Sequence, residues 1–264
     1  MRVFCLPLRG LLAAVLLCVG GGPSLATAQS TAEASLTASV FSQVDSLRQT
    51  GAFEAALARL DSLRARHGDH PDILWRQSLT RVDLAKTYDE KDERKPLYEE
   101  SLQEADAALQ ADSTSGHAHL AKAVAEGRIA LDAGTRERVR RSRAIKRHAD
   151  RAIALDSTLA GAYHVRGRWH REVDDLGFFE RAIVKTVYGG LPDASFEQAV
   201  RDFRRALELE ERSFHYLELG KTYLKMDRTV DARRALQAAL EVPNHDPFAP
   251  RYKDEARELL EDLD

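Results

Sequence analysis

The chain has 264 residues, of which 31% are charged and 44% are hydrophobic, and it carries a formal net charge of −3. Because a general nucleic-acid partner requires a basic surface, this mildly acidic balance argues against one. The two cysteines, Cys5 and Cys18, lie near the N-terminus, so the rest of the chain offers no disulfide, thiol nucleophile or cysteine metal site.

Residues 1–28 are predicted to be a secretory signal peptide. Arg2 and Arg9 form a positive start before a short apolar run over residues 11–19, and Ala26-Thr27-Ala28 has the small residues of a cleavage site before Gln29. The apolar run is too short to span a bilayer comfortably. We therefore expect an exported protein in a bacterial periplasm or at the outer membrane. Its mature net charge is −5, because the signal carries two arginines and no acid.

Two alternatives to a cleaved signal stay open. Cys18 follows an aliphatic run, as the lipidated cysteine of a lipoprotein does, although Leu17 is large for the position before it. The N-terminal segment could also remain as an uncleaved anchor. Residues 29–35 are small and polar and are predicted to be a disordered lead-in.

Residues 36–264 are predicted to form one all-α domain of the tetratricopeptide type. A helix that ends on alanine, an aliphatic residue and usually an acid recurs, with leading alanines at 108, 152, 206 and 239. These alanines are 44, 54 and 33 residues apart, against about 34 residues for a tetratricopeptide repeat. Two units therefore carry extra sequence inside their hairpins, and the predicted fold class is an α-solenoid.

Five helical hairpins and a C-terminal capping helix are expected in chain order. Apolar residues spaced by three and four positions mark the helices, and nothing along the chain alternates like a strand. The hairpins are predicted at about 36–67, 72–109, 118–155, 162–210 and 214–242. The helix at 250–263 has one apolar and one acidic face, as a terminal repeat needs.

The fifth hairpin shows how the two helices of a unit pack. Gly220 should allow the second helix to approach, Tyr223 should fill the groove one turn on, and Ala232, Leu236 and Ala239 form the facing apolar stripe. In the fourth hairpin Gly167 has the part of Gly220. Its hairpin contains about twenty additional residues, which places an insert at 174–194.

Several motifs around this insert carry a family resemblance. They are Arg166-Gly167-Arg168-Trp169, Leu176 to Ile183, Tyr188-Gly189-Gly190-Leu191-Pro192 and Ala194 to Ala199. From about Leu74 to Leu260 the chain resembles the tetratricopeptide-type regulators of microtubule dynamics and their bacterial relatives. The resemblance implies an α-solenoid, protein binding and no catalytic residues, and by name alone it implies a microtubule-binding type of role.

The insert is rich in apolar residues, including Phe178, Phe179, Ile183, Val187 and Tyr188. One interpretation is a short helix that folds back on the solenoid and buries these groups. The other is a lid or wall of a peptide-binding groove.

A basic face is predicted on the second helix of the third hairpin. Its residues are Arg136, Arg140, Arg143, Arg147 and Arg151, spaced by three and four positions, with Val139, Ile145, Ala149 and Ile153 offset toward the core. Such a row is commonly a solvated face, paired in part with acids of neighbouring repeats. The alternative is an anion site for acidic protein segments or for lipid head groups at a membrane surface.

A partner-binding groove is predicted on the first helices of the fourth and fifth hairpins. Helical phase opposite Gly167 and Gly220 selects a basic set that could hold a carboxylate-bearing peptide, namely His164, Arg168, Arg171, Lys221 and Lys225. The likeness to carboxylate-clamp repeats is limited, because Val165 and Glu218 stand where those repeats have asparagine.

Catalysis, metals and cofactors find no support in the sequence. His117 and His119 point about 200° apart on one helix and cannot chelate one metal, His164 and His170 are also out of phase, and no phosphate loop or nucleophile elbow occurs. The expected function is a non-catalytic envelope scaffold or adaptor that holds a protein or peptide partner. The alternatives are membrane or anionic-ligand binding through the basic face, and an enzyme or accessory domain built across repeats.

Overall fold

A computed structural model describes residues 38–263, except for the side chains of Ala38, Phe178 and Phe179. The predicted signal peptide (1–28) and lead-in (29–35) lie outside the described residues. The chain divides into two units, residues 1–41 and 42–264, and the packing given below is that of the second unit by itself. All regular secondary structure within residues 38–263 is helical, which confirms the all-α prediction.

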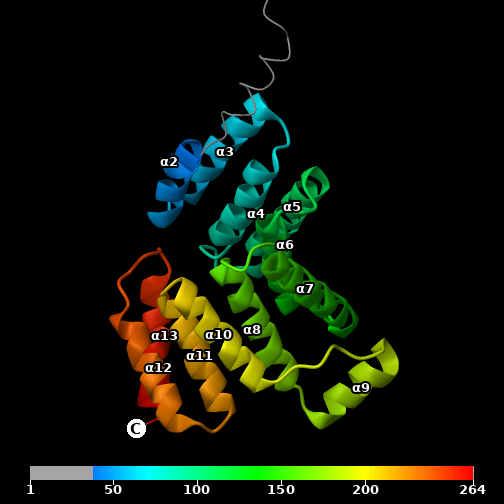
Figure 1. The fold of residues 1–264 in the computed structure, drawn as a ribbon, viewed down its shortest axis with the longest axis vertical. Coiled ribbons are helices and arrows are strands. Elements are labelled where there is room, and N and C mark those ends of the chain that lie inside the picture. The colour runs from blue at the N-terminus through cyan, green and yellow to red at the C-terminus, as the bar shows by residue number, and fades with distance from the viewer. Residues whose placement is uncertain (1–37, 264) are drawn as a thin grey trace, which may run out of the picture. The chain divides into compact units, whose positions relative to one another are not determined.

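The helices follow one another as hairpins, with one additional helix inside the fourth (Figure 1). In chain order they are α2 (Ala38–Gln49), α3 (Phe53–His67), α4 (Pro71–Ala85), α5 (Lys91–Ala111), α6 (Gly116–Asp132), α7 (Thr135–Leu155), α8 (Ala160–Asp174), α9 (Phe178–Tyr188), α10 (Phe196–Leu209), α11 (Ser213–Lys225), α12 (Thr229–Glu241) and α13 (Ala249–Glu261). In four hairpins the first helix packs on the second: α4 on α5, α6 on α7, α8 on α10 and α11 on α12.

Contacts between neighbouring repeats join the hairpins into one array. Each second helix packs on the first helix of the next unit or, for α12, on the capping helix α13. The first helices α4, α6, α8 and α11 and the capping helix contact each other in that order. The first helices therefore form one layer, which is the arrangement of a tetratricopeptide-type solenoid.

Glycines allow the closest helix approaches in this array, as expected. A Cβ atom at Gly220 would lie 2.7 Å from Cδ2 of Leu236, and one at Gly167 would lie 3.0 Å from the ring of Phe203. Tyr223 and Ala232 are buried in the same core cluster as Phe203. The predicted roles of Gly220, Tyr223 and Leu236 are confirmed.

The helix α13 caps the array. Ala256 is buried in a cluster with Leu217, Leu236 and Ala239, and the partly buried residues packed there include Leu259, Leu260 and Leu263. Because α13 contacts both α11 and α12, its apolar face covers the end of the fifth hairpin.

One contact of the array was not foreseen. The loop between α12 and α13 returns to the first two hairpins, where the ring of Phe248 stacks on that of Phe53 with centroids 5.6 Å apart. Leu57 and Leu84 belong to the same cluster, and the Lys86 ammonium group lies 4.5 Å above the Phe248 ring. The last repeat is thus connected directly to the first and second.

Candidate functional site

The first helices carry a repeated arrangement that orients their charged residues. Small residues are buried at equivalent points of four of these helices, namely Ser78, Ala123, Gly167 and Gly220. Five positions further along, on another side of each helix, stand Asp83, Arg128, Glu172 and Lys225. The charges of Asp83, Arg168 and Tyr252 all act on Arg128. We call the side of α4, α6, α8 and α13 that carries these four residues the inner face.

Three of the predicted groove cations surround an internal carboxylate. Glu218 Oε2 lies 2.6 Å from Arg171 Nη2 and 3.5 Å from Arg168 Nε, and Glu218 Oε1 lies 3.6 Å from Lys221 Nζ. Burial would raise the pKa of Glu218, but Arg168, Arg171 and Lys221 lower it to about 2. Glu218 therefore stays ionised and links α8 to α11.

Arg171 is buried and is part of the core ion pairs. Besides its bond to the Glu218 carboxylate, its Nη1 donates to the Glu218 carbonyl at 3.2 Å and its Nη2 donates to Glu172 at 2.9 Å. A side chain with these internal acceptors is not available to a partner's carboxylate, so the expectation that Arg171 lines an open groove is wrong.

His164 also packs between hairpins instead of lining an open wall. Its Nδ1 lies 2.9 Å from Nδ1 of His215, so one ring donates a hydrogen bond to the other, and the His164 ring contacts Phe203 and Phe214 edge-on. Burial, followed by the charge of His215, lowers the pKa of His164 well below its usual value. The helical periodicity of the sequence predicts where His164 lies on its helix, but not that His215 of the next repeat covers it.

Lys225 and Lys221 lie nearer the surface. Lys225 Nζ is 2.8 Å from Asp175 Oδ2, and this pair is exposed enough to be screened by solvent. Lys221 is half-buried and pairs with Glu255 of α13 as well as with Glu218. Arg168, Lys221 and Lys225 remain the predicted groove residues that solvent reaches.

Arg128 of α6 was missed by the sequence analysis. Arg128 is half-buried, and within residues 38–263 its guanidinium group makes no hydrogen bond or ion pair. Burial, followed by the charge of Arg168, lowers its pKa, while Tyr98, Tyr252 and Asp83 act in the opposite direction. The available signal was its position five residues after buried Ala123, equivalent to Lys225 after Gly220.

Asp83, the acid whose charge acts on Arg128, is already paired with two cations. Asp83 Oδ2 accepts from Arg48 Nη2 at 2.8 Å, and Asp83 Oδ1 accepts from Lys86 Nζ at 2.7 Å. The pKa of Asp83 is lowered by Lys86 and Arg48, which outweigh the burial that would raise it. The inner face therefore contains one half-buried guanidinium group, that of Arg128, whose charge no described carboxylate pairs.

The predicted basic face on α7 is present and exposed. Val139 and Ala149 are buried on the opposite side, whereas all five arginines of the row, Arg136, Arg140, Arg143, Arg147 and Arg151, are exposed. Arg140 pairs with Glu137 of its own helix. Arg143 donates to carbonyl groups of the insert, with Nη2 2.6 Å and Nε 3.1 Å from the Gly190 oxygen, and also to the Tyr188 carbonyl.

The insert forms the helix α9, which contacts α7 and projects from the hairpins (Figure 1). The Glu180 side chain accepts from the Gly177 amide at 3.1 Å and caps its start. Val184 is buried and Tyr188 is half-buried, but Ile183 is 53% exposed and Val187 is 63% exposed. The interpretation that the insert buries its apolar groups is therefore wrong for Ile183 and Val187, and the side chains of Phe178 and Phe179 lie outside the described ones.

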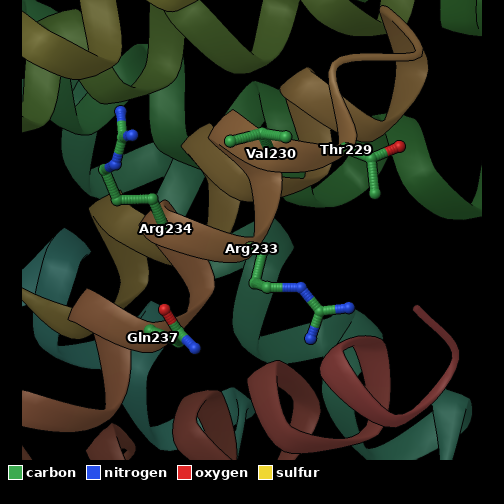
Figure 2. A pocket seen from close by; sticks show the side chains of 5 residues that line it. All are labelled: Thr229, Val230, Arg233, Arg234 and Gln237. Carbon is green, nitrogen blue, oxygen red and sulfur yellow. The ribbon is translucent and has the colours of Figure 1, made fainter. Parts of the chain in front are cut away.

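Two surface hollows among the described residues are further candidates. Figure 2 shows the one on α12, and its lining residues are Thr229, Val230, Arg233, Arg234 and Gln237. All five come from one helix, and Arg233 donates to the Leu263 carbonyl at 2.8 Å, so no convergent set of groups defines a ligand there. The other hollow is lined by Gln49, Arg212, Asn244, His245 and Asp246, beside the returning loop.

The histidines do not gather as metal ligands. His117 stacks on Trp75 with ring centroids 4.5 Å apart, and His119 Nδ1 lies 2.8 Å from His148 Nδ1. Over the part of the chain that the structure describes, no three histidine, aspartate or glutamate side chains are placed to hold a metal ion. Among the same described residues, no helix has the length and apolar character needed to cross a bilayer.

The hairpin array, its glycine contacts and its capping helix define a tetratricopeptide-type repeat protein. The family model described as "Regulator of microtubule dynamics protein 1-3" matches residues 40–264, and the chain belongs to this family. The resemblance noted in the sequence is thereby confirmed.

Individual proteins show the same relationship. Regulator of microtubule dynamics protein 3 of Xenopus laevis is 29% identical over 181 residues, which cover 67% of this chain and 39% of that protein. Protein 1 of Mus musculus is 28% identical over 227 residues, covering 85% of this chain and 74% of that protein. A thermophilic TPR protein of Thermus thermophilus shares the fold with a TM-score of 0.59 at 18% identity, over 82% of this chain and 97% of that one.

Proposed function

We propose that this chain is a non-catalytic scaffold that holds a partner protein by a carboxylate-bearing segment on the inner face. Solenoid repeats offer an extended surface rather than a closed reaction site, and they bind partners along it. The observation that carries the proposal is the half-buried guanidinium group of Arg128, which lacks a carboxylate among the described residues. Its charge makes the inner face complementary to an acid.

The chemistry of the group selects the ligand. A guanidinium fork donates two parallel hydrogen bonds to a carboxylate, and partial removal from water strengthens that pair. Arg168, Lys221 and Lys225 add positive charge along α8 and α11, although each also has an internal acid. We assign Arg128 as the anchor and these three residues as the rim that steers the acidic segment.

The setting of this scaffold is also part of the proposal. The predicted signal peptide supports export and a role in the bacterial cell envelope, in the periplasm or at the outer membrane. The names of the relatives refer to microtubule dynamics, and no contact of the described residues favours that role here. No group of described side chains forms an acid–base or nucleophilic constellation that would favour an enzyme.

Cross-linking in intact cells followed by mass spectrometry tests the proposal. The wild-type chain should recover a reproducible partner, and Arg128→Glu should reduce its recovery at least about tenfold, since a repelling carboxylate replaces the anchor. Arg234→Glu is the matched control, because Arg234 is exposed on α12 away from the inner face. Equal recovery by wild type and Arg128→Glu, at equal melting temperature, would overturn the proposal.

A further inference from the structure

One helix of this acidic chain is strongly basic. The helix α7 contains eight lysine and arginine residues against two acids, Glu137 and Asp150. Glu137 pairs with Arg140 and Arg141, and Asp150 pairs with Lys146 and Arg166. Glu137 therefore compensates one member of the exposed arginine row, Arg140, whereas Arg136, Arg147 and Arg151 have no carboxylate partner among the described residues.

The insert adds exposed aliphatic groups beside this row. Ile183 and Val187 are four residues apart on α9, so they lie on one face of that helix, and both are more than half exposed. The only acid of α9, Glu180, caps its first turn, while Lys185 is exposed. The α9 surface thus combines an apolar face with positive charge.

Arg143 connects the two features. It belongs to the arginine row, and it donates to the carbonyl groups of Tyr188 and Gly190 at the end of α9. A side chain at Gly189 would lie 3.6 Å from Arg143 Nη2, so the backbone of the insert rests directly on the row. The apolar face of α9 and the guanidinium groups of α7 are therefore parts of one surface.

We propose that α7 and α9 dock this protein on the surface of an anionic lipid membrane. Guanidinium groups bind the phosphates of the head groups, and the aliphatic side chains of a helix lying in the interface enter the boundary of the acyl layer. An acidic protein segment would satisfy the arginines, but it gives no reason for exposed Ile183 and Val187. The membrane accounts for both, and this surface is separate from the inner face around Arg128.

Flotation of the full chain with vesicles tests this assignment. Vesicles of phosphatidylcholine with about 30% phosphatidylglycerol should bind the protein, and binding should fall as salt rises from about 50 to 500 mM. The triple variant with Arg136, Arg147 and Arg151 changed to Glu should bind at least about tenfold more weakly. The control reverses three exposed arginines elsewhere, Arg201, Arg234 and Arg251, and should keep most of the binding.

A second variant tests the apolar contribution. Ile183→Ser with Val187→Ser should lose most of the binding that remains at high salt, since that part does not depend on charge. All variants retain residues 1–28, so differences between them report α7 and α9. Equal binding by both triple variants would overturn the proposal. Loss through the arginines with no effect of the serine changes would overturn the insertion of α9, because such binding needs only the charge of the lipid head groups.

Discussion

The Nδ1 atoms of His164 and His215 lie 2.9 Å apart, and His215 is completely buried between the fourth and fifth hairpins. Two imidazoles that share this hydrogen bond cannot both be protonated, because one Nδ1 must accept, and burial lowers the pKa of each ring so that both are neutral. The joint between these repeats therefore depends on unprotonated histidine.

This joint should make stability depend on pH in a defined window. Burial, followed by the charge of Arg212, lowers the pKa of His215 to about 3, against 6.5 in an unfolded chain. Below pH 6.5 the unfolded state binds a proton on His215 that the folded state does not bind. The contribution of His215 to stability is therefore fully present above pH 6.5 and is lost as the pH falls toward 3. Urea denaturation should show a loss of about 2 kcal/mol from this site between pH 7 and pH 5.

A matched variant isolates the histidine contribution. His215→Asn removes the titrating ring, so the stability of the variant should change less between pH 7 and pH 5 than that of the wild type by about 2 kcal/mol. Equal pH dependence in the two proteins would mean that the pair does not titrate as described.

Removing the carboxylate of Glu218 should destabilise the same joint. Glu218→Gln leaves buried Arg171 without its closest ionic partner, and we expect the free energy of unfolding to fall by about 3 kcal/mol. Glu172→Gln removes the other acid that pairs with Arg171. Because the Glu172 side chain is 63% exposed, this change should lower the free energy of unfolding by less than about 0.5 kcal/mol. Similar losses in both variants would contradict the central position of Glu218.

Three helix glycines provide a test of repeat packing. Gly220→Ala places a methyl group 2.7 Å from Leu236 and should destabilise by about 1–3 kcal/mol despite the better helix propensity of alanine. Gly167→Ala should do the same against Phe203, with its nearest ring atom at 3.0 Å. At Gly127 the nearest atom would be 4.0 Å away, so Gly127→Ala should stabilise by up to about 1 kcal/mol. Thermal unfolding of the three variants distinguishes these signs.

Phe248→Ala should loosen two regions that are distant in sequence. Loss of the stacked ring exposes Phe53 and Leu57 of the first hairpin, and we expect a cost of about 2 kcal/mol. Hydrogen exchange should then become faster in α3 and at the start of α13 together. His245→Ala, an exposed change in the same loop, is the control and should leave both regions protected.

The sequence predicted what depends on local periodicity and on residue size. Gly220, Leu236 and Ala239 indicated a helix pair because both helices of that contact lie within one hairpin. The ionic partner of a charged side chain could not be predicted in this way. Arg171 and Glu218 belong to successive repeats, and their positions around their own helices do not show that they form an ion pair. For the same reason the sequence predicts that Arg171 binds a carboxylate of a partner, whereas in the structure it binds the carboxylate of Glu218.

Contacts between distant repeats could not be predicted from local periodicity either. Nothing around Phe248 indicates that it stacks on Phe53, because no periodic pattern connects a loop to the first hairpin. Arg128 was overlooked because the third hairpin has Ala123 where the fourth and fifth have glycine, so the conspicuous glycine motif did not mark it. The register of the buried small residues would have identified it.

The most direct test of the inner-face proposal is a double-mutant cycle between Arg128 and an acid of the partner segment recovered by cross-linking. Titration calorimetry would compare wild type and Arg128→Gln with the segment carrying either its carboxylate or the corresponding amide. The proposal predicts a coupling free energy of about 1.5–3 kcal/mol between the guanidinium group and the carboxylate. Additive effects, with a coupling near zero for every acid of the segment, would contradict it.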